Sequence, residues 1–436
     1  MSVFEAELRS GVPLFWANPG YARQPAGQCD VAISNEAFEA ACRAWAGMQP
    51  LFATLFPAVG ADGGISSPLV PIRHHIGAPA TSHLLLKEDH KLPVAGSIKA
   101  RGGFYEVVCH ALDVARESGL VQAGDPPVAL ARPAVKALLS KYRLCVASTG
   151  NLGLSVGFIG KALGFEVDVF ASREAKTWKL RYLKELGAQV HLVAGDYLSA
   201  LKGAAELSGS DTRSYFVDDE RSRRLFLGYS AAAPEVASQL LAGGYRISRE
   251  QPLAVYLPCG IGGAPGGIAF GLKQLFGDSV HCFFAEPVAS PCMLAALSST
   301  GRPRPSVYDY GLDNCTEADG LAVPRASPLA AGMMRGMLSG IYTVADNELL
   351  VDLADVKRFL GERIEPSAAA GMAGPRRLLG SAAGKRYLRD NKLTGRLKSL
   401  VHVVWSTGGS LVPEAEHQAW CIAAETLQRE RALVST

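Results

Sequence analysis

The chain has 436 residues, a length that allows two or three domains. Hydrophobic residues make up 48% of it and charged residues 19%, which is ordinary for a globular protein and excludes wholesale disorder. The formal net charge of +3 is spread along the chain, so neither nucleic acid nor a membrane surface is indicated as a partner. The nine cysteines form no C-x-x-C pair, which argues against a zinc site or a disulfide framework and favours a reducing compartment.

The sequence also indicates a cytoplasmic location. Its N-terminus carries Glu5, Glu7 and Arg9 and lacks the apolar segment of a signal peptide. The uncharged stretch 252–272 is long enough to suggest a membrane span, but its prolines and glycines are typical of a strand, a loop and a helix start. We therefore expect no membrane-spanning segment.

Residues 1–65 are predicted to form a helical extension that takes no part in chemistry. Apolar side chains recur there at helical spacing. They are Phe38, Ala41, Cys42, Trp45 and Met48. Asn35 is the expected N-cap of this helix.

The segment Gly96–Gly103 places Lys99 among small residues. A lysine amine becomes chemically special when it forms a Schiff base with a carbonyl, and pyridoxal phosphate is the commonest cofactor used in that way. The small neighbours Gly96, Ser97 and Ala100 leave room for a planar cofactor. Taken alone, this segment does not distinguish such a lysine from a solvated surface charge.

Short apolar runs alternate with helical patterns from residue 142 onward, which predicts a parallel sheet. The expected strands lie at 144–147, 167–170, 190–193, 253–257, 280–284 and 401–405. The expected helices lie at 104–117, 154–163, 175–186, 221–227 and 268–275. The basic residues Lys176, Lys179, Arg181 and Lys184 are expected on the solvated side of one of these helices.

Three turns after predicted strands carry candidate binding groups, because parallel sheets bind ligands at the carboxyl ends of their strands. The segment 258–267 is rich in glycine and leads into a helix, so its backbone N–H groups can converge on a phosphate. Its spacing matches neither the dinucleotide fingerprint nor a Walker loop. A plain tight turn is the alternative, but so many glycines are entropically costly without a reason.

The other two turns are less specific. Residues 148–151 offer hydroxyl and N–H groups to a carboxylate, although simple N-capping of the next helix explains them equally well. Ser406 and Thr407 follow the last predicted strand and offer hydroxyls to a ring nitrogen, although alone they are more often an ordinary turn.

Together and in this order, the lysine and the three turns resemble the fold type II family of pyridoxal phosphate enzymes, the tryptophan-synthase-β group. Within it, the match is closest to the bacterial D-serine dehydratases. The resembling blocks span about residues 70 to 415. They read LPVAGSIKARGGFYEV, ASTGNLGLSVG, DDERSRRLFLGY, PCGIGGAPGGIAFGLK, AEPVASPCM, ADGLAV and EPSAAAGMAGP.

The resemblance implies an α/β fold of two domains with largely parallel sheets and the helical N-terminal extension 1–65. Residues 66–140 and 230–436 would form the large cofactor-binding domain, and residues 141–229 the small one. A monomer is implied as well.

The resemblance also assigns roles in cofactor binding. Lys99 would hold pyridoxal phosphate as a Schiff base and later act as a base. Asn151 would bond the ring oxygen, and Thr407 (rather than Ser406) would face the ring nitrogen. The phosphate would be bound through the backbone N–H groups of Gly260, Gly262, Gly263 and Ala264, the last being alanine where the family leads us to expect glycine.

Further implied roles concern the substrate and an ion. The substrate carboxylate would be received by Ser148, Thr149, Gly150 and Asn151. Related enzymes often hold a monovalent cation, sodium or potassium, near the sequence that matches Glu286, Ser290 and Cys292. Asp218 and Asp219 are candidates for a second acid or base, and Asp218 is the one we assign; a capped turn before the next helix is the alternative reading of both.

The implied reaction is α,β-elimination from D-serine, and from D-threonine, giving pyruvate or 2-oxobutanoate and ammonia. A neutral hydroxyl at the ring nitrogen fits elimination, because an aspartate there would strengthen the electron sink and favour transamination or racemisation. Three alternatives stay open: a lyase of the same fold acting on L-serine, L-threonine or diaminopropionate; a pyridoxal-phosphate-dependent synthase; and a cofactor-free binding protein on the same scaffold.

Overall fold

The computed structural model of the chain describes residues 3–21, 33–61, 63–72, 83–148, 150–173, 175–299 and 304–434, without the side chains of 3–5 and 431–434. Thr149 and Cys29 lie outside the described residues. Contacts between Cα atoms divide the chain into two compact units. Unit 1 comprises the described residues of 1–32, 67–91 and 233–436, and unit 2 comprises those of 33–66 and 92–232.

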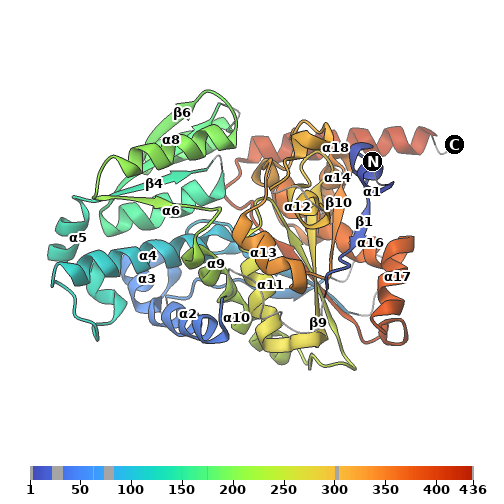
Figure 1. Cartoon of the computed structure of the whole chain (residues 1–436), viewed down its shortest axis with the longest axis horizontal. Coiled ribbons are helices and arrows are strands. Elements are labelled where there is room, and N and C mark those ends of the chain that lie inside the picture. The colour runs from blue at the N-terminus through green and yellow to red at the C-terminus, as the bar shows by residue number, and fades with distance from the viewer. Residues whose placement is uncertain are drawn as a thin grey trace. The chain divides into compact units, whose positions relative to one another are not determined.

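Unit 1 is built on a seven-stranded sheet in the order β1-β10-β9-β8-β11-β3-β2. The strands are β1 (Phe15–Ala17), β2 (Leu69–Pro71), β3 (His83–Glu88), β8 (Leu253–Pro258), β9 (Val280–Pro287), β10 (Gly340–Val344) and β11 (Val401–Ser406). The inner five strands are parallel, and β1 and β2 pair antiparallel at the two edges. Strands β1, β9 and β10 of this sheet are labelled in Figure 1. This sheet carries the glycine-rich segment and the Ser406–Thr407 turn.

The helices of unit 1 connect and cover these strands. They are α1 (Val3–Arg9), α10 (Ala232–Ala242), α11 (Gly263–Phe276), α12 (Cys292–Ser298), α13 (Pro328–Met337), α14 (Asp346–Leu360), α15 (Pro366–Ala369), α16 (Gly374–Gly380), α17 (Ala382–Asp390) and α18 (Glu414–Val434). Short 3-10 turns lie at Asp89–Lys91, Gly277–Ser279, Val307–Tyr310, Asp319–Leu321, Ala370–Ala373 and Thr394–Arg396.

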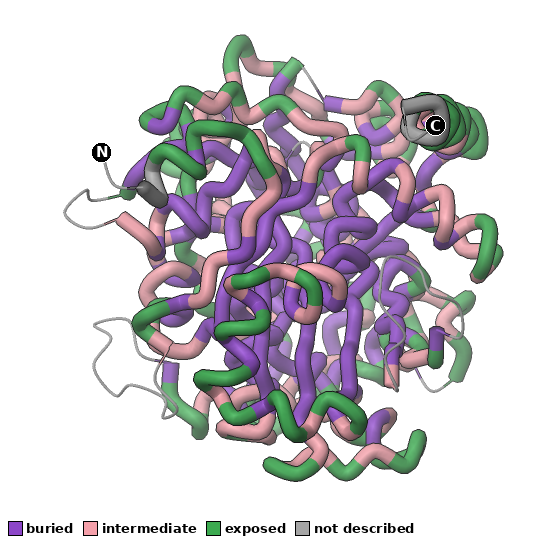
Figure 2. The backbone as a smooth tube through the Cα atoms, turned by 90° about the vertical axis from the view of Figure 1, so that its right-hand side faces the viewer, coloured by how far each residue is buried: buried purple, intermediate pink, exposed green. Residues whose placement is uncertain are grey.

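Burial explains why the inner strands read as continuous apolar runs. Every residue of β8, β9, β10 and β11 is buried, so the sheet is covered on both faces and no polar alternation is needed. Figure 2 shows the buried, purple part of the backbone in the interior and the exposed, green segments at the periphery, on helices as well as loops. The carboxyl ends of the strands are therefore held on a rigid, dry support.

Unit 2 contains a four-stranded parallel sheet in the order β6-β5-β4-β7. Its strands are β4 (Arg143–Ala147), β5 (Glu166–Ser172), β6 (Gln189–Val193) and β7 (Ser214–Val217). Its helices are α2 (Asn35–Gly47), α3 (Gln49–Leu55), α4 (Lys99–Glu117), α5 (Pro133–Leu139), α6 (Asn151–Leu163), α7 (Thr177–Glu185), α8 (Tyr197–Gly209) and α9 (Arg223–Ser230), with 3-10 turns at Pro57–Val59 and Pro127–Ala131.

The observed units differ from the expected domain division. Residues 92–140, expected in the large domain, group with unit 2, because α4 packs against α6 and α9 there. The expected N-terminal extension is split: β1 pairs with β10 in unit 1, whereas α2 and α3 belong to unit 2. The N-cap of α2 is Ser34, whose side chain accepts a bond from Ala37 N, and not Asn35.

Two further expectations can be compared with the described part of the chain. None of its eight cysteines forms a disulfide, and four of them are buried. Among the helices of the described residues, none combines the length and the apolar character required to cross a bilayer.

The acid stability of unit 1 should depend on His402, which is buried in β11 and whose Nδ1 is hydrogen-bonded to the Tyr256 hydroxyl at 2.8 Å. Burial lowers the pKa of His402 from 6.5 to about 3. The folded state therefore binds fewer protons than the unfolded state between these values, and the stability present above pH 6.5 is lost as the pH falls through that window.

We predict that the thermal unfolding midpoint of His402→Gln falls less between pH 7 and pH 5 than that of the natural protein. The difference corresponds to about 2 kcal/mol at pH 5. Calorimetry at both pH values measures it, and parallel decreases in the two proteins would show that His402 does not cause the acid sensitivity.

Candidate functional site

Lys99 is the first residue of α4, and its amine lies beside a carboxylate. The chain reaches it through Gly96, whose φ of +57° is the left-handed conformation that favours glycine. Lys99 Nζ lies 3.5 Å from Asp219 Oδ2 and 5.7 Å from the centre of the Tyr229 ring. With 19% of its side chain exposed, the amine is sheltered yet reachable, as a nucleophilic lysine must be.

Two glycines bring α9 against α4 and so fix what lies around Lys99. A Cβ on Gly102 would lie 2.4 Å from Tyr229 Cζ on α9, and a Cβ on Gly228 would lie 2.6 Å from Tyr105 Cβ on α4. Real Cβ atoms do not approach other atoms so closely. Glycine is therefore required at both positions, and the Tyr229 ring covers the first turn of α4.

The turn that precedes α9 separates the roles of Asp218 and Asp219. Asp218 Oδ1 accepts hydrogen bonds from the backbone N–H groups of Glu220 at 2.9 Å and Arg221 at 3.3 Å, which is a local turn-stabilising arrangement. Asp219, and not Asp218, is the carboxylate beside Lys99. The geometry thus favours Asp219 over Asp218 as the second acid or base, and the assignment of Asp218 stays a prediction.

The Ser148–Asn151 turn connects β4 to α6 in unit 2. Ser148 Oγ accepts a hydrogen bond from Gly150 N at 3.1 Å, and Asn151 is the first residue of α6. Thr149, which is also expected to bind the carboxylate, lies outside the described residues. The helix start at Asn151 provides N–H groups and a favourable dipole for an anion.

Lys179 is a buried charged residue, contrary to the prediction from its sequence neighbourhood. Expected on the solvated side of α7, it is buried, with 2% of its surface exposed. A Cβ on Gly150 would lie 3.6 Å from Lys179 Nζ, so this ammonium is close to the turn expected to bind a carboxylate. Only the fold shows this, because the neighbouring lysines in the sequence look alike.

Several buried polar atoms of unit 2 have no hydrogen-bond partner within the described residues. They include four atoms near Lys99 or Asp219, namely Asp219 Oδ1, Tyr197 Oη, Tyr229 Oη and Ser97 Oγ. Burial raises the pKa of both tyrosines well above the usual value, and the nearby Asp219 carboxylate raises the pKa of each further. Buried polar groups in proteins are normally paired, so this group fits a polar ligand next to Lys99.

The glycine-rich segment of unit 1 forms a tight turn between β8 and α11. Gly262 has a φ of +105°, and a Cβ there would lie 2.3 Å from Met293 Cε. A Cβ on Gly260 would lie 3.0 Å from the Cα of Leu321. Ala264 is already inside α11, and its backbone is not left-handed, so its side chain is accommodated and its N–H is retained. This helix start is suited to a phosphate group.

Ser406 and Thr407 lie at the same edge of the sheet as the glycine-rich turn, because β8 and β11 are adjacent and parallel. Both residues are buried, and Ser406 Oγ has no hydrogen-bond partner within the described residues. Either hydroxyl fits a ligand with a ring nitrogen, and the assignment of Thr407 remains a prediction.

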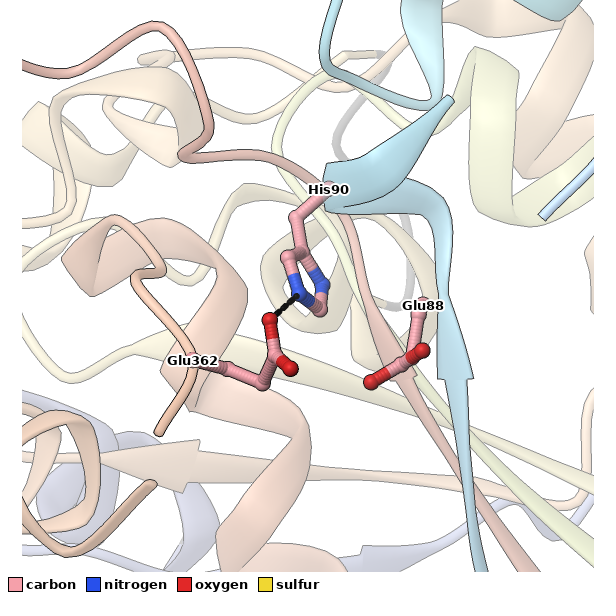
Figure 3. Close-up of side chains that lie close together, drawn as sticks. All are labelled: Glu88, His90 and Glu362. Atoms are coloured by element: carbon pink, nitrogen blue, oxygen red, sulfur yellow. Dashed lines mark hydrogen bonds and ion pairs between the residues drawn. The ribbon is translucent and has the colours of Figure 1, made fainter. Parts of the chain in front are cut away.

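An ion-pair network closes the carboxyl end of β3. The side-chain ligand atoms of Glu88, His90 and Glu362 lie within 4.8 Å of one another (Figure 3). The Lys91 ammonium contacts Glu88 Oε2 at 3.0 Å and Glu362 Oε1 at 2.7 Å. A metal ion would have to displace the Lys91 ammonium, which already balances the negative charge of Glu88 and Glu362.

The three residues expected near a monovalent cation differ in their surroundings. Glu286 is fully buried and accepts bonds from Met293 N and Leu294 N, and burial raises its pKa to about 8. Cys292 Sγ donates to Gly260 O at 3.2 Å. Ser290 Oγ lies among three oxygens. They are Asn314 Oδ1 at 2.7 Å, Val323 O at 3.2 Å and Leu321 O at 3.3 Å.

Comparison with known sequences agrees with these observations. The model of the family described as "Pyridoxal-phosphate dependent enzyme" matches residues 61–388. A probable D-serine dehydratase of Rhizobium leguminosarum bv. trifolii (strain WSM2304) is 44% identical over 427 residues, which cover 97% of each chain. A probable D-serine dehydratase of Paracidovorax citrulli (strain AAC00-1) is 51% identical over 360 residues, covering 82% of this chain and 80% of that one.

Comparison with solved structures supports the fold. The diaminopropionate ammonia-lyase of Escherichia coli in complex with D-serine matches with a TM-score of 0.70 at 15% identity, covering 94% of this chain and 97% of that one. The processed form of threonine deaminase isoform 2 from Solanum lycopersicum matches with a TM-score of 0.63 at 19% identity, covering 94% and 97%. The chain therefore has the type II fold and belongs to the family of pyridoxal-phosphate-dependent enzymes, in the group whose curated relatives are named probable D-serine dehydratases.

Proposed function

We propose that this protein is a pyridoxal-phosphate-dependent lyase that converts D-serine to pyruvate and ammonia by α,β-elimination, and D-threonine to 2-oxobutanoate and ammonia. The observation that carries the proposal is the 44–51% identity, over most of the chain, to relatives named probable D-serine dehydratase. The placement of Asp219 beside the Lys99 amine supports it, because elimination needs groups that move protons at Cα and at the leaving hydroxyl.

The cofactor-binding roles follow from the residues that fit its parts. Lys99 would bind the aldehyde carbon, and Asn151 the ring oxygen. The phosphate would be bound by the backbone N–H groups of the turn Gly260–Ala264, and the ring nitrogen by Thr407. When bound, the cofactor supplies the electron sink that acidifies the Cα–H bond of the substrate.

The side chains of this protein would do the remaining work. The turn of Ser148, Thr149, Gly150 and Asn151 would bind and orient the substrate carboxylate, with the buried charge of Lys179 close by. The Lys99 amine would hold the proton taken from Cα. The carboxylate of Asp219, 3.5 Å from that amine, would be the second group that holds a proton, next to the leaving hydroxyl.

We also propose that a potassium or sodium ion binds at the oxygens around Ser290, and that the enzyme acts as a cytoplasmic monomer. The support for the ion is the gathering of Asn314 Oδ1, Leu321 O and Val323 O about one hydroxyl, since carbonyl and amide oxygens are the ligands that hard monovalent cations prefer. This gathering could not be identified from the sequence.

The substrate assignment is tested by assaying pyruvate from D-serine and from L-serine separately. We expect pyruvate chiefly from the D-isomer and none from either isomer with Lys99→Ala, because that variant lacks the amine. Comparable turnover of L-serine would contradict the D-specificity and favour an L-serine or L-threonine lyase.

Phosphate binding is tested by Gly262→Ala, with Ala264→Gly as the matched control. The φ of +105° and the approach to Met293 Cε make a side chain at Gly262 costly by about 1–2 kcal/mol, so we expect roughly tenfold weaker retention of pyridoxal phosphate. Ala264→Gly, in ordinary helical backbone, should retain the cofactor. Absorbance of the bound cofactor during titration measures both, and equal affinities would refute the phosphate role.

The cation is tested by comparing activity in potassium, sodium and tetramethylammonium chloride at equal ionic strength. We expect severalfold higher activity with a small cation, because the large organic ion cannot fit among the oxygens at Ser290. Ser290→Ala should lose most of this difference. Equal activity in all three salts would contradict a cation requirement.

A further inference from the structure

Glu106 is a buried carboxylate on α4 that the proposed reaction does not use. It follows Lys99 by seven residues, two helical turns, and therefore lies on the same face of α4. Only 1% of its surface is exposed. A buried carboxylate is costly unless it is hydrogen-bonded, so its partners indicate what it is for.

Both partners of Glu106 come from the segment that carries Asp219. Tyr215 Oη donates to Glu106 Oε1 at 2.9 Å, and Ser222 Oγ donates to Glu106 Oε2 at 2.5 Å. Tyr215 lies on β7, which ends at Val217, and Ser222 is the N-cap of α9. One carboxylate thus holds both flanks of the turn 218–221.

The turn is tied to these flanks by its own backbone. Ser222 N donates to Asp218 O at 2.9 Å, and Ser222 Oγ accepts from Leu225 N at 3.0 Å. Because the Ser222 hydroxyl oxygen is engaged by Leu225 N, its single proton is directed at Glu106. Glu106 is therefore connected to Asp219 through the Ser222 hydrogen bond and the turn that the bond from Ser222 N to Asp218 O closes.

The other charged groups near Glu106 act on it or on Tyr215 and make no described bond to residues 218–221. Arg224 is a cation that acts on Glu106, but its guanidinium is paired with Asp113 on α4 at 2.6 Å. His110 stacks on the Tyr215 ring at 3.9 Å, and burial lowers the pKa of His110 to about 4, which leaves it neutral at physiological pH. Asp113 and Arg224 join α4 to α9 without contacting residues 218–221 by any described bond.

We propose that Glu106 is a positioning residue: by binding Tyr215 and Ser222 it fixes the turn that presents the Asp219 carboxylate to the Lys99 amine. This role rests on the proposed elimination, since it sets the geometry of the two proton-carrying groups in that reaction. Proton transfer is sensitive to displacement, and an error of about 1 Å costs about a hundredfold in rate.

The test compares variants of the cofactor-loaded enzyme. Glu106→Ala loses the hydrogen bonds to Tyr215 and Ser222. Glu106→Gln has a side chain of the same size that can still hydrogen-bond both hydroxyls. Asp113→Ala is the matched control, because it breaks the ion pair with Arg224 that also joins α4 to α9. Asp219→Asn, alone and combined with Glu106→Ala, shows whether Glu106 acts through Asp219. Kinetics with D-serine and hydrogen exchange of the backbone amides of residues 218–222 are measured for each.

We expect kcat of Glu106→Ala to fall at least about tenfold while KM changes less than about threefold, because the turn expected to bind the substrate carboxylate is untouched. Glu106→Gln and Asp113→Ala should stay within about threefold of the natural enzyme. The double variant should be no slower than Asp219→Asn alone, since both changes remove the same contribution.

Three results would overturn the proposal: a kcat unchanged in Glu106→Ala, additive losses in the double variant, or unchanged amide exchange of residues 218–222. The exchange measurement needs no substrate. An enzyme inactive on D-serine would therefore contradict the proposed function, while the exchange rates still decide whether Glu106 holds the turn.

Discussion

The contact on which unit 2 most depends is the close approach of α4 and α9 at Gly102 and Gly228. Without side chains at these positions, the two helices can lie against each other and the Tyr229 ring can cover the first turn of α4. That approach brings the turn before α9 to the start of α4, where Lys99 and Asp219 come within 3.5 Å. A larger residue at either glycine would separate the amine from the carboxylate before any substrate is bound.

In unit 1 the corresponding constraint is strand order. Because β8 and β11 are neighbours and parallel, the turn at Gly260–Ala264 and the hydroxyls of Ser406 and Thr407 leave the sheet at the same edge. Strand β3 lies on the other side of β11, and its register sets Glu88 opposite Ser406. The ion pairs of Lys91 with Glu88 and Glu362 therefore fix the chain directly beside the hydroxyls expected to meet a ring nitrogen.

Much of this was predictable from local pattern, and the exceptions have physical causes. Strands buried on both faces read as apolar runs, so β8, β9 and β11 are predicted close to their observed positions, although the equally buried β10 is not. Strand β3 was missed because its run ends in charged residues: Lys87 is fully buried and ion-paired with Glu235 on α10, a partner distant in sequence. Lys179 was misplaced for a similar reason, since nothing in its neighbourhood distinguishes it from the other lysines of that helix. The roles of Asp218 and Asp219 could not be distinguished from the sequence either. The two residues are adjacent, and only the backbone conformation of the turn decides which carboxylate caps it and which lies beside Lys99.

The arrangement of groups around Lys99 lowers the stability of the fold, because several buried polar atoms there lack hydrogen-bond partners within the described residues. Such an atom destabilises a fold by about 1–3 kcal/mol, and Asp219 Oδ1, Tyr197 Oη, Tyr229 Oη and Ser97 Oγ are four of them in one region. Natural folds retain such atoms where a ligand completes their hydrogen bonds. Since Glu106 already pairs both flanks of the turn, the turn is held before the ligand arrives, and the ligand meets groups that need not reorganise. The same carboxylate that stabilises the turn thus allows Asp219 to keep one oxygen available beside Lys99.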